Sequence, residues 1–245
     1  MGVALVTGAS RGLGAEIARR LAGDGWAVAV NYLPDRADAE RVVAAIVAGG
    51  GVAEAFRADV TDETAVAALV AHVEDRLGPV RVLVPNATGP QPSKPALEVS
   101  WSDHLDQLRF FVKSPTLLMH AVMPAMRRLG GGRIVQIGSD MPERAEPGMS
   151  AYAAAKAAQM SLTRTWAREL GPLGVTVNLV APGWIPVERH AAVAAEHVDA
   201  YRRDVPLGRM GTPAEVADVV AFLASDDARF VTGERITVNG GHTLG

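Results

Sequence analysis

The sequence predicts an α/β fold, a single domain over residues 1–245 built on a doubly wound parallel sheet with helices on both faces. Short apolar runs, typical of strands buried on both faces, alternate with helix-like segments along the whole chain. A glycine-rich turn separates the first apolar run from the first helix. The length of 245 residues fits one such domain, and no repeat, linker or low-complexity segment divides it.

Bulk composition indicates an ordinary globular protein and excludes several kinds of site. Hydrophobic residues make up 49% and charged residues 21%, and the net charge of −3 gives no reason to expect nucleic-acid binding. The absence of cysteine excludes disulfides, thiolate metal sites and cysteine nucleophiles. No uncharged apolar run approaches the roughly 18 residues of a membrane span, and an apolar strand follows Met1 with no room for a signal peptide. We therefore expect a cytoplasmic protein.

The first apolar run, residues 3–7, leads directly into the glycine-rich turn 8–14 and then into a helix over residues 15–21. Glycines let backbone N–H groups approach a pyrophosphate, and the amino terminus of a helix favours its negative charge. Such a turn is a weak signal on its own. Its position between a first strand and a first helix favours a dinucleotide-binding site.

The end of the second predicted strand, residues 26–31, bears on which nicotinamide dinucleotide binds. An acidic residue there would bind a free ribose 2′-hydroxyl and repel a 2′-phosphate. This chain has Asn31 and no acid until Asp35, while Arg11 lies in the glycine turn, where its charge would meet a 2′-phosphate. We therefore favour NADP(H) over NAD(H). In the alternative, Arg11 is a solvated loop residue and Asp35 binds the ribose.

The remaining elements alternate in the same way, with Asp62 and Thr212 as expected helix N-caps and with Pro115 and Pro124 as expected kinks of one long helix. Residues 184–207 are the least regular part, and we assign the substrate loops to about 184–210. The other predicted strands are 52–58, 80–84, 133–139, 175–180 and 235–238. The other predicted helices are 38–47, 62–77, 101–129, 191–203 and 213–224. One more predicted helix carries Tyr152 and Lys156 and continues to about residue 170.

Three side chains near the middle of the chain indicate carbonyl chemistry. Tyr152 and Lys156 lie one helical turn apart on one face, and the neighbouring ammonium is expected to lower the phenol pKa from its usual value of about 10. Ser139, at the end of a predicted strand, would orient a carbonyl oxygen. Together the three residues could donate a proton to a substrate carbonyl and hold its oxygen in place. The Tyr-x-x-x-Lys spacing alone is weak, because the tyrosine could pack and the lysine could be solvated.

Ordered motifs extend over essentially the whole chain. They are Thr7-Gly8-x-x-x-Gly12-x-Gly14, Asp59, Asn86-Ala87, Ser139, Tyr152-x-x-x-Lys156, Asn178 and Pro182-Gly183. With these motifs the chain resembles the short-chain dehydrogenase/reductases, which have a Rossmann-type fold. It is most similar to their 3-oxoacyl-(acyl-carrier-protein) reductase-like members.

This resemblance implies a role for each matching residue. Tyr152 would be the general acid, Lys156 would lower the phenol pKa and bind the nicotinamide ribose, and Ser139 would hold the substrate oxygen. The resemblance also implies a homotetramer. The residues expected to bind the cofactor, in addition to Tyr152 and Lys156, are Gly8, Ser10, Arg11, Gly12, Leu13, Gly14, Asn31, Asp59, Val60, Asn86, Ala87, Pro182, Gly183 and Ile185.

Several positions depart from the family pattern. Thr88 replaces a glycine that lets the backbone run close to the nicotinamide ribose, and Val187 replaces a threonine for the carboxamide. Phe111 replaces an asparagine that supports a water-linked proton path to the lysine. Gly130 and Leu173 stand where carrier-protein reductases often have basic docking residues. The resemblance therefore leaves the involvement of an acyl carrier protein open.

The leading hypothesis is an NADPH-dependent reductase of a ketone, with a 3-oxoacyl or polyketide-like compound among the candidate substrates. The candidate substrate segments, residues 88–92, 141–149 and 184–201, carry few fixed charges and favour a neutral or apolar substrate. A cofactor-binding sensor or assembly protein with little turnover is the alternative. Metal catalysis through His190 and His197 is disfavoured by their seven-residue spacing.

Overall fold

The computed structural model describes residues 2–188 and 194–244. Within these residues seven strands form one parallel sheet in the order β3-β2-β1-β4-β5-β6-β7, which confirms the predicted α/β class and parallel sheet. The strands are β1 (Val3–Val6), β2 (Ala27–Tyr32), β3 (Val52–Arg57), β4 (Val80–Val84), β5 (Gly132–Ile137), β6 (Val175–Pro182) and β7 (Arg235–Val238).

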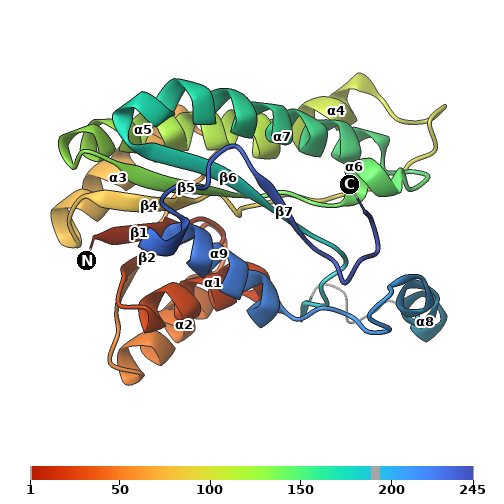
Figure 1. Cartoon of the computed structure of the whole chain (residues 1–245), viewed down its shortest axis with the longest axis horizontal. Helices are drawn as coiled ribbons and strands as arrows, with labels where there is room; N and C mark the ends of the chain where they lie inside the picture. Colours follow the sequence, from red (N-terminus) through yellow and green to blue (C-terminus); the bar gives the residue numbers. More distant parts are fainter. Residues whose placement is uncertain (1, 189–193, 245) are drawn as a thin grey trace.

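Helices cover both faces of this sheet (Figure 1). One face carries α1 (Gly12–Gly23), α2 (Arg36–Ala48) and α9 (Pro213–Ala224), and the other carries α3 (Glu63–Arg76), α5 (Ser114–Arg128) and α7 (Ser150–Leu170). The remaining helical segments are α4 (Trp101–Leu108), the π-helical turn η1 (Arg109–Lys113), α6 (Met141–Arg144), η2 (Gly171–Leu173), α8 (Ala195–Asp204) and η4 (Asp226–Ala228).

Two separate cores follow from the alternation of side chains along the strands. Val6 points to the face covered by α1, where it packs in one cluster with Ile17. Its neighbour Leu5 points to the opposite face and packs in a second cluster with Leu118 of α5. Both faces of β1 are therefore buried, which explains why this strand is apolar at every position.

The order of the strands in the sheet indicates where a ligand would bind. The chain leaves β1 toward β2 on one side and continues from β4 toward β5 on the other, so the order reverses between the adjacent strands β1 and β4. Ligands of open α/β sheets bind in the crevice outside the carboxyl ends of the strands at such a reversal. The glycine turn after β1 and Ser139 after β5 both follow strand ends at this edge.

The predicted long helix 101–129 is helical from Trp101 to Arg128, with a π-helical turn inside it. The π-turn η1 lies between α4 and α5, and Pro115 follows it as the second residue of α5. Pro124 lies inside α5, which continues to Arg128. The wider turn carries Phe111, which is buried beneath the helix layer.

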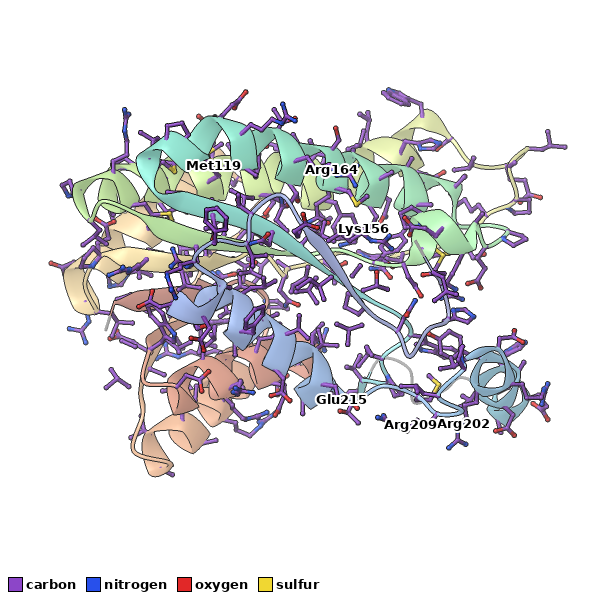
Figure 2. The ribbon with its side chains drawn as sticks, viewed as in Figure 1. Met119, Lys156, Arg164, Arg202, Arg209 and Glu215 are labelled. Carbon is purple, nitrogen blue, oxygen red and sulfur yellow. The ribbon has the colours of Figure 1, made fainter. Side chains whose placement is uncertain are left out.

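Other boundaries differ in detail. A short helix, α6, begins at Met141 in the segment predicted as a loop, and the helix predicted over 191–203 is described as α8 from Ala195 to Asp204. Residues 189–193 lie outside the described part of the chain. Thr212 is the N-cap of α9, as predicted, and forms a capping box with Glu215. Glu215 also forms an ion pair with Arg209 at 2.5 Å (Figure 2). The predicted N-cap Asp62 accepts from the Ala65 amide.

Candidate active site

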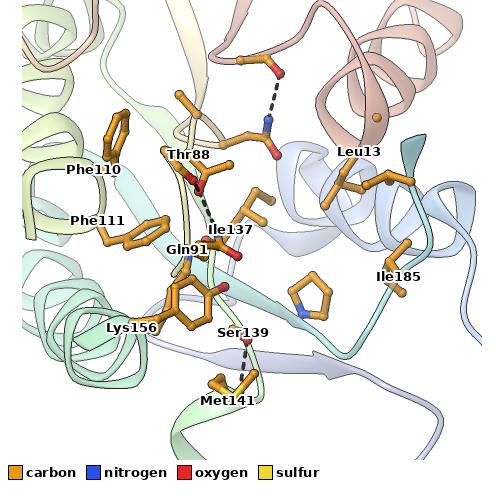
Figure 3. A pocket seen from close by; sticks show the side chains of 18 of the residues that line it. Leu13, Thr88, Gln91, Phe110, Phe111, Ile137, Ser139, Met141, Lys156 and Ile185 are labelled. Atoms are coloured by element: carbon orange, nitrogen blue, oxygen red, sulfur yellow. Dashed lines mark hydrogen bonds between the residues drawn. The ribbon is translucent and has the colours of Figure 1, made fainter. Parts of the chain in front are cut away.

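A cavity of about 1270 Å³ opens at the carboxyl ends of the strands. Every residue that the sequence assigns to catalysis or to cofactor binding lines it, although these residues come from segments spread over most of the chain. In Figure 3, Phe111, Ile137, Ser139 and Lys156 lie together, and Leu13 and Ile185 face them across the opening. The cavity thus joins the glycine turn to the Ser139 and Lys156 side chains in one continuous space.

The glycine turn is tightly built. Gly8 and Gly12 have φ angles of +60° and +54°, in the region that disfavours side chains. A Cβ at Gly14 would lie 2.4 Å from the Gly8 carbonyl oxygen and 2.5 Å from Asn86 Nδ2. Since α1 begins at Gly12, the first backbone N–H groups of this helix lie at the cavity wall, as binding of a pyrophosphate requires.

Two side chains that follow strands β1 and β4 hold this turn in place. Thr7 Oγ1 accepts from the backbone N–H groups of Asn86 and Ala87 at 2.9 and 3.0 Å. Asn86 Nδ2 donates to the carbonyl oxygens of Thr7 and Gly8 at 2.9 and 3.2 Å. Thr7 is not among the predicted site residues, and its position at the end of β1 is the signal that could have indicated this role.

Asn31 has a positioning role that the sequence does not indicate. Its Oδ1 accepts from Gly8 N at 3.3 Å, and its Nδ2 donates to the carbonyl oxygens of Phe56 and Ala58 at 3.3 and 3.2 Å. The side chain is 2% exposed and ties the glycine turn to the end of β3. Asp35 likewise has a local partner, because its carboxylate accepts from Asp38 N and caps α2.

The three residues with predicted catalytic roles are brought to one end of the cavity. Tyr152 and Lys156 lie one turn apart on α7, with Lys156 Nζ 5.7 Å from the centroid of the Tyr152 ring. Ser139 Oγ accepts from Met141 N at 3.1 Å, and this contact fixes the hydroxyl beside α6. Lys156 is 4% exposed and its ammonium donates to the Ile137 carbonyl oxygen of β5, whereas Arg164 of the same helix is exposed (both labelled in Figure 2).

A polar cluster that sequence reasoning missed forms the far wall. Asp140 is 1% exposed, accepts from Asn239 Nδ2 at 3.1 Å and lies 3.6 Å from His242 Nδ1. The ring of Tyr201 on α8 packs against His242, with centroids 4.6 Å apart, and its hydroxyl accepts from Trp184 N at 2.8 Å. Burial raises the pKa of the Tyr201 phenol above its usual range.

Two further observations limit the kinds of site. Among the described residues no group of three His, Cys, Asp or Glu side chains could hold a metal ion; His197 is exposed on α8, and His190 lies outside the described residues. In the part of the chain that the structure describes, no helix is both long and apolar enough to cross a bilayer.

Comparison with known proteins gives the family. The model described as Enoyl-(Acyl carrier protein) reductase matches residues 8–243. The 3-oxoacyl-(acyl-carrier-protein) reductase FabG of Staphylococcus aureus is 40% identical over 240 residues, which is 97% of this chain and 96% of that protein.

Solved structures agree with this match. A short-chain dehydrogenase/reductase variant from Serratia marcescens superposes with a TM-score of 0.93 at 36% identity, over 99% of this chain and 98% of that one. A blue fluorescent protein from a metagenomic library, solved in complex with NADPH, superposes with a TM-score of 0.91 at 38% identity over the same shares of the two chains. The predicted resemblance is confirmed: the chain is an oxidoreductase that belongs to the short-chain dehydrogenase/reductase family.

Proposed function

We propose that this protein is an NADPH-dependent carbonyl reductase that converts a ketone to an alcohol. The observation that carries the proposal is the single cavity that joins the glycine turn at α1 to Ser139, Tyr152 and Lys156. The turn fits a dinucleotide, because the positive φ angles at Gly8 and Gly12 and the absence of a side chain at its three glycines leave backbone N–H groups at the cavity wall.

The proposed reaction divides the work between the cofactor and the chain. When bound, the nicotinamide supplies the hydride that reaches the carbonyl carbon. Ser139 orients the carbonyl oxygen, and Tyr152 gives that oxygen its phenolic proton as the C–H bond forms. The ammonium of Lys156 lies beside the phenol and stabilises the negative charge that the lost proton leaves on it. The products are the alcohol and the oxidised dinucleotide.

NADPH is the favoured cofactor, since Arg11 is exposed at the cavity wall and Asp35 serves as the cap of α2. We expect Arg11→Ala to weaken NADPH binding by about tenfold or more, the usual range for losing a hydrogen bond to a charged group, and to leave NADH binding almost unchanged. Fluorescence titration of each cofactor measures this. An equal loss for both cofactors would contradict a contact between Arg11 and the 2′-phosphate.

The substrate side of the cavity favours an uncharged ketone. Apolar and aromatic side chains line it, including Met149 and Trp184. Arg144, the one arginine among the described residues of that wall, pairs with Glu146 at 2.5 Å and lies 3.8 Å from Asp140. Asp204 adds a further carboxylate at the cavity. The described part of the wall is therefore net negative and would repel an anionic substrate.

A matched pair of ketones tests the function and the charge preference together. We expect the enzyme to oxidise NADPH with ethyl acetoacetate and to use the acetoacetate anion at least about tenfold less efficiently, in line with one unfavourable charge contact. Consumption of NADPH is followed in both reactions at equal ketone concentration. A preference for the anion would contradict the assigned substrate class.

Two other proposals concern turnover and assembly. Phe111, Thr88 and Val187, which replace the usual residues of the family, motivate a sensor with little turnover, and tight NADPH binding without turnover on any ketone would favour it. The homotetramer implied by the family is supported by exposed apolar side chains, namely Trp101 and Leu105 on α4, Phe222 on α9 and Phe230 before β7.

A further inference from the structure

We propose that Phe111 and Gln159 together form a seat for the ammonium of Lys156 and act as its positioning residues, in place of the asparagine of the family pattern. The effect on turnover rests on the proposed reductase function, whereas the seat itself is a property of the protein that can be measured without any substrate.

The ammonium of Lys156 needs partners because it is buried. A lysine ammonium has three N–H donors, and removing it from water is costly unless these donors are satisfied. Lys156 Nζ donates to the Ile137 carbonyl oxygen at 2.7 Å and to Gln159 Oε1 at 3.1 Å. The first partner is a backbone atom, which any residue at position 137 would supply. The second depends on the glutamine side chain, which is 1% exposed.

A further contact comes from Phe111. The Lys156 Nζ lies 3.7 Å from the centroid of the Phe111 ring, well within the range of a cation–π interaction, and the ring is 3% exposed (Figure 3). Such an interaction strengthens when the cation is desolvated. The same ring packs edge-on against Tyr152, with centroids 5.4 Å apart and an interplanar angle of 84°. One aromatic side chain therefore fixes both the ammonium and the phenol.

The backbone at both residues supports this seat. Phe111 lies in the π-turn η1, and a single π-turn inside a helix commonly marks a functional position. At Gln159, the backbone carbonyl accepts from Thr163 Oγ1 at 3.0 Å, and Thr163 Oγ1 accepts from Gln136 Nε2 of β5 at 2.9 Å. These bonds tie α7 to the sheet directly behind the lysine.

Groups that favour the charged form of an amine make it hold its proton to higher pH. The titratable group that faces Lys156 from its own helix is Tyr152, while Phe111, Gln159 and the Ile137 carbonyl carry no titratable group. Arg109 and Lys113, at the ends of η1, are exposed. Changes at Phe111 and Gln159 should therefore appear directly in the titration of Lys156.

The chain contains three lysines, Lys94, Lys113 and Lys156, so their side-chain carbons can be followed individually by NMR after labelling lysine with carbon-13. Substitution of Lys94 and Lys113 by arginine, one at a time, assigns the signals. We expect Gln159→Leu and Phe111→Leu each to lower the titration midpoint of Lys156 by about one pH unit. Gln159→Glu, which keeps the acceptor and adds a charge, should raise it.

The opposite shifts of the two Gln159 variants separate the seat from a merely structural role, since general loosening of the helix would move both in one direction. The Lys94 signal, whose ammonium pairs with Asp103 at 2.7 Å, is the internal control and should not move. Phe110→Leu removes a neighbouring ring that packs at Gly89 instead, and should leave the Lys156 midpoint unchanged. An unchanged midpoint in Phe111→Leu or Gln159→Leu, or shifts of equal sign at Gln159, would overturn the proposal.

Kinetics then links the seat to the reaction. In the pH profile of kcat/KM for ketone reduction, the alkaline limb should move to lower pH in Gln159→Leu and to higher pH in Gln159→Glu. These shifts should parallel the titration midpoints of Lys156 measured by NMR. If the wild-type protein binds NADPH but reduces no ketone, the proposed function fails while the titration still decides the seat. If turnover is present and the limb does not follow the midpoints, the seat does not act in catalysis and this part of the proposal is overturned.

Discussion

Replacing Tyr152 by phenylalanine is expected to lower kcat for ketone reduction by between about 100-fold and 10,000-fold, the range for removing a positioned general acid. The variant keeps the ring that packs against Phe111 and removes only the hydroxyl. Packing of η1 against α7 should therefore persist, and the thermal unfolding midpoint should stay close to that of the wild type. Stopped-flow or steady-state consumption of NADPH measures the loss.

NADPH affinity is the control for this variant. Tyr152 is expected to contact the cofactor through its hydroxyl, whereas the glycine turn that would hold the pyrophosphate lies at the other end of the cavity. Kd should therefore rise by no more than about tenfold, the usual size of one hydrogen bond. If Tyr152→Phe retains more than a tenth of the turnover, another group supplies the proton and the role assigned to Tyr152 is wrong.

Replacing Gly14 by alanine is expected to abolish measurable NADPH binding and to destabilise the fold. The new Cβ would lie 2.4 Å from the Gly8 carbonyl oxygen and 2.5 Å from Asn86 Nδ2. Both distances are shorter than a van der Waals contact, so the neighbouring atoms must move. These two atoms are hydrogen-bonded to each other, and the Gly8 carbonyl belongs to the turn, so the turn itself has to move. Overpacking of this kind costs typically about 1–3 kcal/mol of unfolding free energy, which denaturant titration would detect.

The same helix offers a matched control. Gly23 is the last residue of α1 and has no positive φ angle, and a methyl group added there would meet no neighbouring side chain or strand within 4 Å. Gly23→Ala should therefore leave NADPH binding unchanged and stabilise the protein by up to about 1 kcal/mol. Equal loss of binding in both glycine variants would show that the helix, and not the turn at Gly14, determines the effect.

The parts of the molecule that the sequence predicts are those with local causes. Apolar runs predict strands because a parallel sheet buries both faces, and the Gly8–Gly14 turn is recognisable because a positive φ angle needs glycine. The Tyr152–Lys156 spacing is likewise fixed by the period of one helix. The other candidate site residues are indicated by the resemblance to the family, and all of the candidate residues line the same cavity.

The parts that escape prediction depend on residues far apart in the chain. The presence of Phe111 is visible in the sequence, but its contact with Lys156 depends on a π-turn that no residue pattern marks. Asn239 and His242 approach Asp140 from about a hundred residues away, where spacing carries no information. Asn31 lies at the cavity as the sequence predicts, yet its hydrogen bonds depend on the register of β2 against β3.

The two halves of the cavity are built from different kinds of structure, and this gives them different freedom to change. The cofactor half rests on strand ends and on the closely packed glycine turn, where a single methyl group is expected to be disruptive. The half proposed to bind the ketone is lined chiefly by segments that connect the strands, namely residues 88–91, residues 141–149 and α8. Connecting segments tolerate substitution far better than the elements they join. Laboratory evolution confined to those segments is therefore expected to change which ketone the protein accepts. The cofactor site should stay unchanged.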